Sequence, residues 1–217
     1  MPITAVLGVQ WGDEGKARIV DVLAPVADAV IRFQGGSNAG HTVVIGEKTF
    51  KLHQIPSGVL HPGKQSVIAS GAVVEPGRLV EEIRSLESVG LEIKSRLIVS
   101  ERAHVVLPWH LAHDRADASG APGTAGASGQ PAIGTTGRGI GPCYTDKACR
   151  RGFRLVDLLE AGPALADLLQ PAYDAHAREL AGKALPPFPE LISTLRQHLD
   201  VLSPMVGDTR AFLERMM

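Results

Sequence analysis

The chain has 217 residues, of which 44% are hydrophobic, and its 22 Lys and Arg nearly balance its 23 Asp and Glu, so that the formal net charge is −1. This composition is typical of a globular domain and lacks the basic excess of a protein that mainly binds a nucleic-acid backbone. No apolar run approaches the roughly 18 residues of a membrane-spanning helix, and the first residues lack the features of a signal peptide. We therefore expect no nucleic acid and no membrane as partner.

The two cysteines, Cys143 and Cys149, fit neither zinc-ligand spacing nor a secreted disulfide framework. We expect reduced thiols in a cytoplasmic protein. The 24 glycines and 15 prolines exceed average usage, which predicts that much of the chain lies in turns and loops.

A strand, a glycine loop and a helix are predicted at the start of the chain. Residues 3–9 are apolar and rich in β-formers, Gly12 and Gly15 follow, and apolar residues at helical spacing continue up to Pro25. Residues 28–33 predict a second buried strand. Two strands joined through a helix predict a parallel pair with a right-handed crossover, and ligands of such sheets bind at the carboxyl ends of the strands.

Further strands and two helices are predicted after residue 41. Residues 42–45 and 49–52 predict a hairpin, residues 67–74 a strand, and residues 97–100 and 105–107 two short strands. Prolines open two predicted helices, one from residue 76 to the glycine at residue 90 and one from residue 108.

The composition changes in the last hundred residues. Residues 119–131 are almost all small, which predicts a flexible surface loop, and residues 155–217 predict mostly helix. The helical pattern is still apolar where it stops at residue 217. We therefore predict an α/β fold with a mainly parallel central sheet, flanking helices and a helical C-terminal part.

Residues 12–16, Gly-Asp-Glu-Gly-Lys, are the first candidate site. Glycines between a strand and a helix let backbone N–H groups approach an anion, and Lys16 adds a positive charge. The loop resembles a phosphate loop but departs from the Walker A pattern, because Gln10 stands at the first glycine and Ala17 at the magnesium-binding hydroxyl. Spacing alone leaves open a structural glycine turn with a solvated Asp-Glu pair.

Two more clusters are candidates for a nucleotide site. Residues 34–42 combine three glycines with Asn38 and with His41, which can exchange a proton near neutral pH. Residues 133–142 combine glycines and hydroxyls and are followed by Arg150 and Arg151, which suit phosphate. A polar loop and a flexible loop with a basic rim are the simpler alternatives.

Other residues allow chemistry but favour packing. His110, His113 and Asp114 could suggest a metal site, although nothing further in the sequence completes it. We interpret His53 as a hydrogen-bonded partner, and Trp11 and Trp109 as packing residues.

Taken in order, these clusters closely resemble adenylosuccinate synthetases. The resemblance rests on residues 10–16 with Ile19-Val20-Asp21, on residues 34–36 and 38–42, on Leu52-His53 with residues 55–58, and on residues 134–142 with Tyr144, Asp146-Lys147 and Arg150. It implies a P-loop-NTPase-like fold and a cytoplasmic, homodimeric ligase of purine biosynthesis that uses GTP and Mg²⁺. The implied reaction joins IMP to L-aspartate through 6-phosphoryl-IMP and yields adenylosuccinate, GDP and phosphate.

The resemblance also implies roles for individual residues. Asp13 matches the general base, His41 the general acid, and Lys16 a phosphate-binding catalytic residue, while Asp13 and Gly40 match the metal ligands. The matched IMP contacts are Asp13, Glu14, Gly15, Lys16, Asn38, Ala39, Gly40, His41, Thr136 and Arg150, the last reaching across the dimer. The matched GTP contacts are Gly12, Asp13, Glu14, Gly15, Lys16, Ala17, Arg18, Gly40, His41 and Thr42.

Three departures accompany the resemblance. The usual Gly-Lys-Gly-Lys is Gly15-Lys16-Ala17-Arg18, a usual Gly-Asn-Gly is Ala69-Ser70-Gly71, and family members are about twice this length. We therefore expect residues 1–217 to be the N-terminal portion of one such domain, with little or no ligase activity alone. The alternatives are a nucleotide-binding remnant or partner subunit without catalysis, and a GTP hydrolase.

Overall fold

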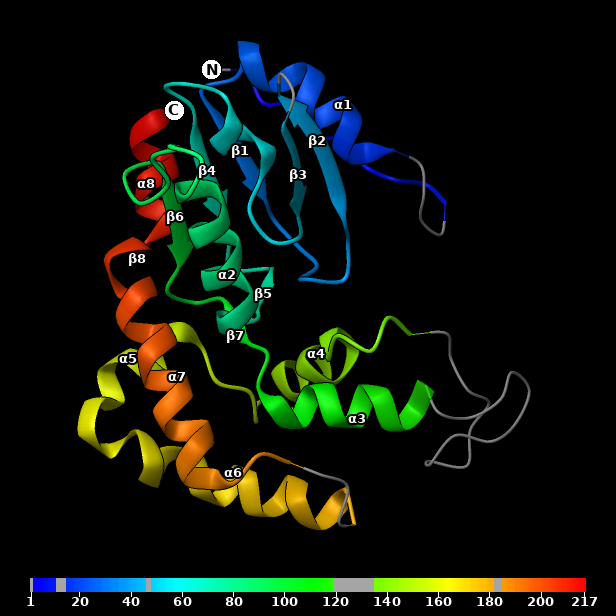
Figure 1. The fold of residues 1–217 in the computed structure, drawn as a ribbon, viewed down its shortest axis with the longest axis vertical. Coiled ribbons are helices and arrows are strands. Elements are labelled where there is room, and N and C mark those ends of the chain that lie inside the picture. Colours follow the sequence, from blue (N-terminus) through cyan, green and yellow to red (C-terminus); the bar gives the residue numbers. More distant parts are fainter. Residues whose placement is uncertain (1, 11–14, 46–47, 119–134, 182–184) are drawn as a thin grey trace.

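The computed structural model describes residues 2–10, 15–45, 48–118, 135–181 and 185–217. Four parallel strands form its central sheet in the order β1 (Ala29–Arg32), β4 (Gln65–Ile68), β6 (Leu97–Ser100) and β8 (Val206–Gly207). The helices α1, α2 and α8 lie near this sheet (Figure 1). The predicted α/β class with a parallel sheet is confirmed.

Most helices lie where apolar periodicity or an opening proline predicts them, and α4 is the exception. α1 (Lys16–Leu23) follows the first glycine loop, and prolines open both α2 (Pro76–Glu87) and α3 (Pro108–Ala118). The later helices along the chain are α4 (Ile140–Ala148), α5 (Leu155–Ala161), α6 (Leu165–Glu179), α7 (Phe188–Leu202) and α8 (Thr209–Met216). The C-terminal part is mostly helical, as expected.

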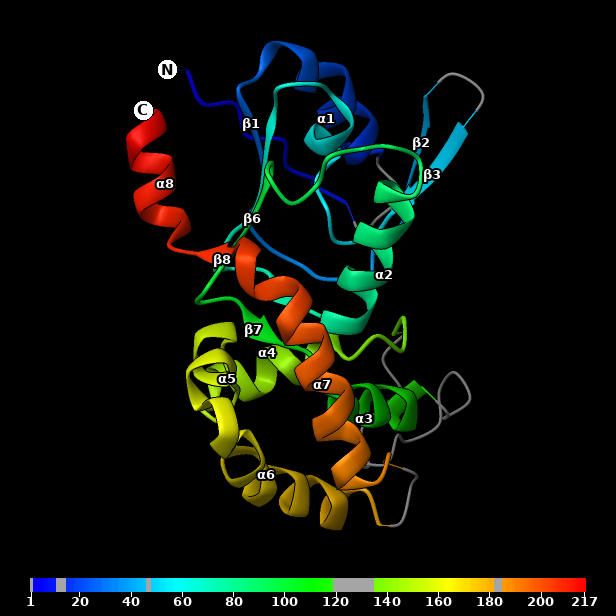
Figure 2. The same ribbon diagram turned by 60° about the vertical axis from the view of Figure 1, so that its left-hand side comes forward.

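The main core lies between the sheet and two long helices. α2 lies over the sheet and contacts α7, which continues toward α6 (Figures 1 and 2). The apolar faces of these two helices contribute Leu79, Ile83, Leu195 and Leu199, each less than 6% exposed. An antiparallel hairpin of β2 (His41–Ile45) and β3 (Lys48–Leu52), which confirms the predicted hairpin, flanks the sheet at one end of the molecule. The helices α3 to α6 lie at the other end.

The prediction of a strand at residues 3–9 is wrong. In the described part of the chain no ladder pairs with this segment, and Ile3, Leu7 and Val9 are 79%, 66% and 95% exposed. A β-rich segment becomes a strand only where a sheet edge accepts its backbone hydrogen bonds. β1 is the edge strand of the sheet, and none of these residues pairs with its free edge.

Four element assignments also differ from the predictions. The strand expected at 67–74 divides into β4 and β5 (Val73–Val74), because Ala72 donates a backbone hydrogen bond to Ala69 and turns the chain. The strand expected at 105–107 is β7 (His104–Val105), which pairs with β5. The helix α4 begins inside the loop expected at 133–142, and β8 interrupts the helical part.

Other local features concern the cysteines, the tryptophans and the apolarity of the helices. Cys143 is buried and Cys149 exposed, both with free thiols, and burial raises the pKa of Cys143 to about 12. Trp109 is a packing residue at 1% exposure. Within the described ranges, no helix is both long and apolar enough to cross a bilayer. The expected loop at 119–131 and Trp11 lie outside the described residues.

Candidate functional site

The loop that leaves β1 is held by the side chain of Arg32. Its guanidinium donates hydrogen bonds to the carbonyls of His53 and Gly36, so that one partly buried cation ties the loop at Gly36 to the segment that directly follows the hairpin. Burial lowers the pKa of Arg32, and the carboxylate of Glu82 partly offsets this effect. The glycine loop is therefore a positioned element at the carboxyl end of a sheet strand.

Glu82 organises the neighbouring turn from α2. It is 7% exposed, and its two oxygens accept the backbone N–H groups of His53, Gln54 and Ile55 at 3.0–3.1 Å. Burial raises the pKa of Glu82, and the three hydrogen bonds and Arg32 counteract it. The carboxylate thus satisfies three main-chain donors that would otherwise lack partners.

Close packing between the loop and α4 requires glycine at position 36. A Cβ at Gly36 would lie 2.4 Å from Ile140 Cδ1 and 2.9 Å from Val73 Cγ2. Tyr144 of α4 adds polar contacts, since its hydroxyl accepts the N–H of Gly35 at 2.9 Å and donates to the carbonyl of Gly71 at 2.8 Å. Two loops at the carboxyl ends of adjacent strands are thereby joined to one helix.

Asp114 of α3 anchors the third glycine-rich segment. Its carboxylate accepts the hydroxyl of Thr135 and, at 2.7 Å, the backbone N–H of Gly139, which adopts a positive φ of 71° at the start of α4. Asp114 is 6% exposed. The segment before α4 is therefore fixed to α3 by a buried charge.

The second and third motifs face the same cavity. It has a volume of about 610 Å³, and both Asn38 and Thr136 line it. The other lining residues are His110, His113, Asp114, Thr135, Ile140, Gly141, Pro142, Thr145, Asp146, Arg151, His176 and Glu179. A cavity of this size suits a small molecule such as a nucleotide.

The remaining predicted site residues lie on other elements. Lys16, Ala17 and Arg18 open α1 after Gly15, whose φ is 73°. Ala39 and Gly40 precede β2, which begins with His41 and Thr42. Arg150 follows α4, is exposed and has a positive φ of 59°. Gly12, Asp13 and Glu14 lie outside the described residues.

Two histidines near the glycine loop have pKa values that burial shifts below the ordinary value. Burial lowers the pKa of His41, with the carboxylate of Asp21 acting in the opposite direction. His53 lies 3.0 Å from the carbonyl of Ala39 through Nδ1, which agrees with the expected hydrogen-bonded role, and partial burial lowers its pKa. A neutral imidazole at neutral pH can either donate or accept a proton.

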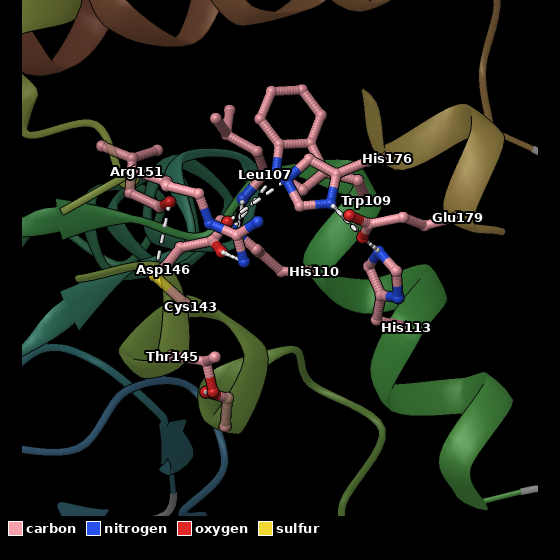
Figure 3. Close-up of polar contacts among 12 residues, drawn as sticks. Leu107, Trp109, His110, His113, Cys143, Thr145, Asp146, Arg151, His176 and Glu179 are labelled. Carbon is pink, nitrogen blue, oxygen red and sulfur yellow. Dashed lines mark hydrogen bonds and ion pairs between the residues drawn. The ribbon is translucent and has the colours of Figure 1, made fainter. Parts of the chain in front are cut away.

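A largely buried network around Asp146 forms part of the cavity wall (Figure 3). His110 Nδ1 accepts the N–H of Leu107 at 2.9 Å, and its Nε2 lies 3.1 Å from both the carboxylate of Asp146 and the indole Nε1 of Trp109. His176 Nε2 and Arg151 contact the same carboxylate at 3.2 and 3.1 Å. Burial disfavours ionisation, but these partners outweigh it and hold the pKa of Asp146 below its ordinary value.

Sequence patterns did not single out His176 of this network, or Glu82, as functional. Glu82 could have been noticed as a charge within the apolar face of α2, whereas no signal links Asp146 to His176. His110 and Asp114 serve the contacts described above, so these two residues and His113 do not form the metal site considered from the sequence.

Comparisons with known proteins agree with this geometry. Residues 5–217 match the family model for adenylosuccinate synthetase. The adenylosuccinate synthetase of Halothermothrix orenii is 44% identical over 219 residues, covering 96% of this chain and 47% of that protein. The one from Clostridium botulinum (strain Langeland) is 56% identical over 155 residues, covering 71% of this chain and 35% of the relative.

A solved structure gives the same answer. The fully ligated adenylosuccinate synthetase from Plasmodium falciparum superimposes with a TM-score of 0.83 at 33% identity, covering 96% of this chain and 47% of that one. The chain thus spans about half the length of the relatives it matches. On the family match across residues 5–217, the chain belongs to the adenylosuccinate synthetase family.

Proposed function

We propose that this chain provides the N-terminal portion of a GTP-dependent ligase domain that joins IMP to L-aspartate, forming adenylosuccinate, GDP and phosphate. The observation that carries the proposal is the family match over residues 5–217. It is supported by the cavity that Asn38 and Thr136 line together. We further propose that the protein acts in the cytoplasm as a homodimer.

The proposed mechanism assigns one task to each matched residue. Asp13 accepts the N1 proton of IMP, and the 6-oxygen then attacks the γ-phosphate of GTP. Lys16 and the N-terminal end of α1 hold phosphate oxygens, and His41 stabilises the charge that develops on the leaving GDP. The amine of aspartate then displaces phosphate from carbon 6.

The donor set fits one Mg²⁺ ion in each subunit. Asp13 offers a carboxylate and Gly40 a carbonyl, and oxygen ligands are those that Mg²⁺ prefers. Gly40 is exposed, with open space at its Cα except for His53, 3.6 Å from a Cβ built there. When bound, the ion neutralises charge on phosphate oxygens.

Two features of the described residues support the assigned substrate contacts. The N-terminus of α1 begins at Lys16 directly after a left-handed glycine, an arrangement that suits phosphate. The exposed Arg150, held in a left-handed conformation by the turn after α4, is accessible to a second subunit. The remaining proposed contacts are those named from the resemblance.

Calorimetric titration of IMP into the purified chain tests the proposal. We expect binding that Asn38→Ala and Thr136→Val each weaken, whereas Thr194→Val, an exposed residue of α7, leaves it unchanged. Absence of IMP binding, or binding that ignores both substitutions, would contradict the proposed site.

Turnover is measured separately on the same preparation. Adenylosuccinate formation from IMP, aspartate and GTP with Mg²⁺ is expected to be little or none, because the relatives carry about as many residues again. IMP binding without turnover agrees with an N-terminal portion that needs further chain. Robust turnover would contradict this expectation, and GTP hydrolysis without IMP would indicate a hydrolase.

A further inference from the structure

Three potential metal ligands converge where α3 meets α6. His113 comes from α3, and His176 and Glu179 come from one turn of α6 (Figure 3). His113 Nε2 lies 3.1 Å from His176 Nδ1, and Glu179 Oε2 lies 3.6 Å from each of these two nitrogens. In the described part of the chain this group could hold a metal ion.

The three separations match a tetrahedral metal site. Zinc binds histidine nitrogen and carboxylate oxygen at about 2.0–2.2 Å, so two ligand atoms at the corners of a tetrahedron lie about 3.3–3.6 Å apart. The three distances between ligand atoms in the structure are 3.1, 3.6 and 3.6 Å. Two of them lie at the upper end of this range, and one lies about 0.2 Å below it. Two histidines and one carboxylate are also a ligand set that zinc uses in proteins.

A hydrogen-bond chain explains only part of this arrangement. His176 Nδ1 and His113 Nε2 are close enough for one hydrogen bond between the two imidazoles. Glu179 is too far from either nitrogen for a good hydrogen bond, yet it lies equally far from both. A cation placed among the three atoms accounts for the carboxylate as well.

The residues around His176 hold its ring in an orientation that suits a metal ligand. Its Nε2 lies 3.2 Å from a carboxylate oxygen of the buried Asp146, and its Nδ1 faces His113 and Glu179. The ring stacks on the buried Trp109 with 5.3 Å between centroids and 14° between planes. Metal-bound histidines characteristically donate their other nitrogen to a carboxylate in this way.

We propose that His113, His176 and Glu179 bind a zinc ion, with Asp146 as the partner that positions His176. All three ligands line the cavity that Asn38 and Thr136 also face, so the fourth coordination position is accessible to water or a small ligand. The ion joins α3 to α6. Because α3 carries Asp114, which anchors Thr135, metal binding stiffens one wall of the cavity.

Spectroscopy with cobalt tests the site independently of any enzymatic activity. Co²⁺ added to the purified chain is expected to give the intense visible absorption of a tetrahedral complex, and Zn²⁺ at one equivalent is expected to remove it. His113→Ala and Glu179→Gln, at positions 25% and 51% exposed, should each weaken binding by at least about tenfold. Asp146→Asn should weaken it by about 10- to 100-fold.

His61→Ala is the matched control, because His61 is a partly exposed histidine that contacts the carboxylate of Asp21 at 3.1 Å. It should leave the cobalt spectrum and the zinc affinity unchanged. Failure of the chain to bind Zn²⁺, or binding that neither His113→Ala nor Glu179→Gln weakens, would overturn the proposal. The first result would leave the contact between the two imidazoles as a hydrogen bond only.

Discussion

Replacing Glu82 by alanine tests whether one carboxylate supports the turn beside the glycine loop. The substitution removes the acceptor of three backbone N–H groups, those of His53, Gln54 and Ile55. A buried donor left without a partner costs about 1–3 kcal/mol, so we expect the free energy of unfolding to fall by at least about 3 kcal/mol. Arg32 also loses its nearby negative charge.

Urea unfolding followed by circular dichroism measures this loss, and Glu81→Ala is the control. Glu81 is the exposed neighbour on the same helix, and its substitution should change the free energy of unfolding by less than about 0.5 kcal/mol. Glu82→Gln retains one acceptor oxygen and should fall between the two. A loss below about 1 kcal/mol for Glu82→Ala would refute the reasoning, because water would then be satisfying the three donors. Hydrogen exchange at these amides reports the same effect locally.

Three further predictions concern stability and pH. Gly36→Ala places a methyl group 2.4 Å from Ile140 Cδ1, so thermal unfolding should show a lower Tm and calorimetry a weaker affinity for IMP; unchanged values would show that α4 can move aside. Tyr144→Phe removes two hydrogen bonds and should lower the free energy of unfolding in urea by about 1–3 kcal/mol, whereas no change would mean that water replaces the hydroxyl. Acidification from about pH 7.5 to about pH 5.5 should lower the urea midpoint, because burial lowers the folded-state pKa of several histidines below the ordinary 6.5. For a histidine with a lowered folded-state pKa, the stabilisation is present above pH 6.5 and is lost as the pH falls through the folded-state pKa, because the unfolded chain binds more protons. A higher urea midpoint at the lower pH would contradict this prediction. The histidines concerned are His41, His53, His104, His176 and His198.

The sequence by itself determined the class of the fold and most of its helices. The apolar pattern of α2 between Pro76 and Gly90, and the proline that opens α3, are local signals that the helices follow. The order of the glycine-rich motifs likewise identified the family. These features depend on residues near one another in the chain, so they can be recognised before the chain is folded.

Only the tertiary structure decided which segments pair and which side chains meet. Residues 3–9 carry a strand pattern but find no pairing edge in the described part of the chain, whereas the two-residue β8 forms because β6 offers one. His113 and His176 lie 63 positions apart, and the packing of α3 on α6 brings them within 3.1 Å. Strand pairing and side-chain clusters depend on such long-range contacts, which no local pattern of apolar and polar residues encodes.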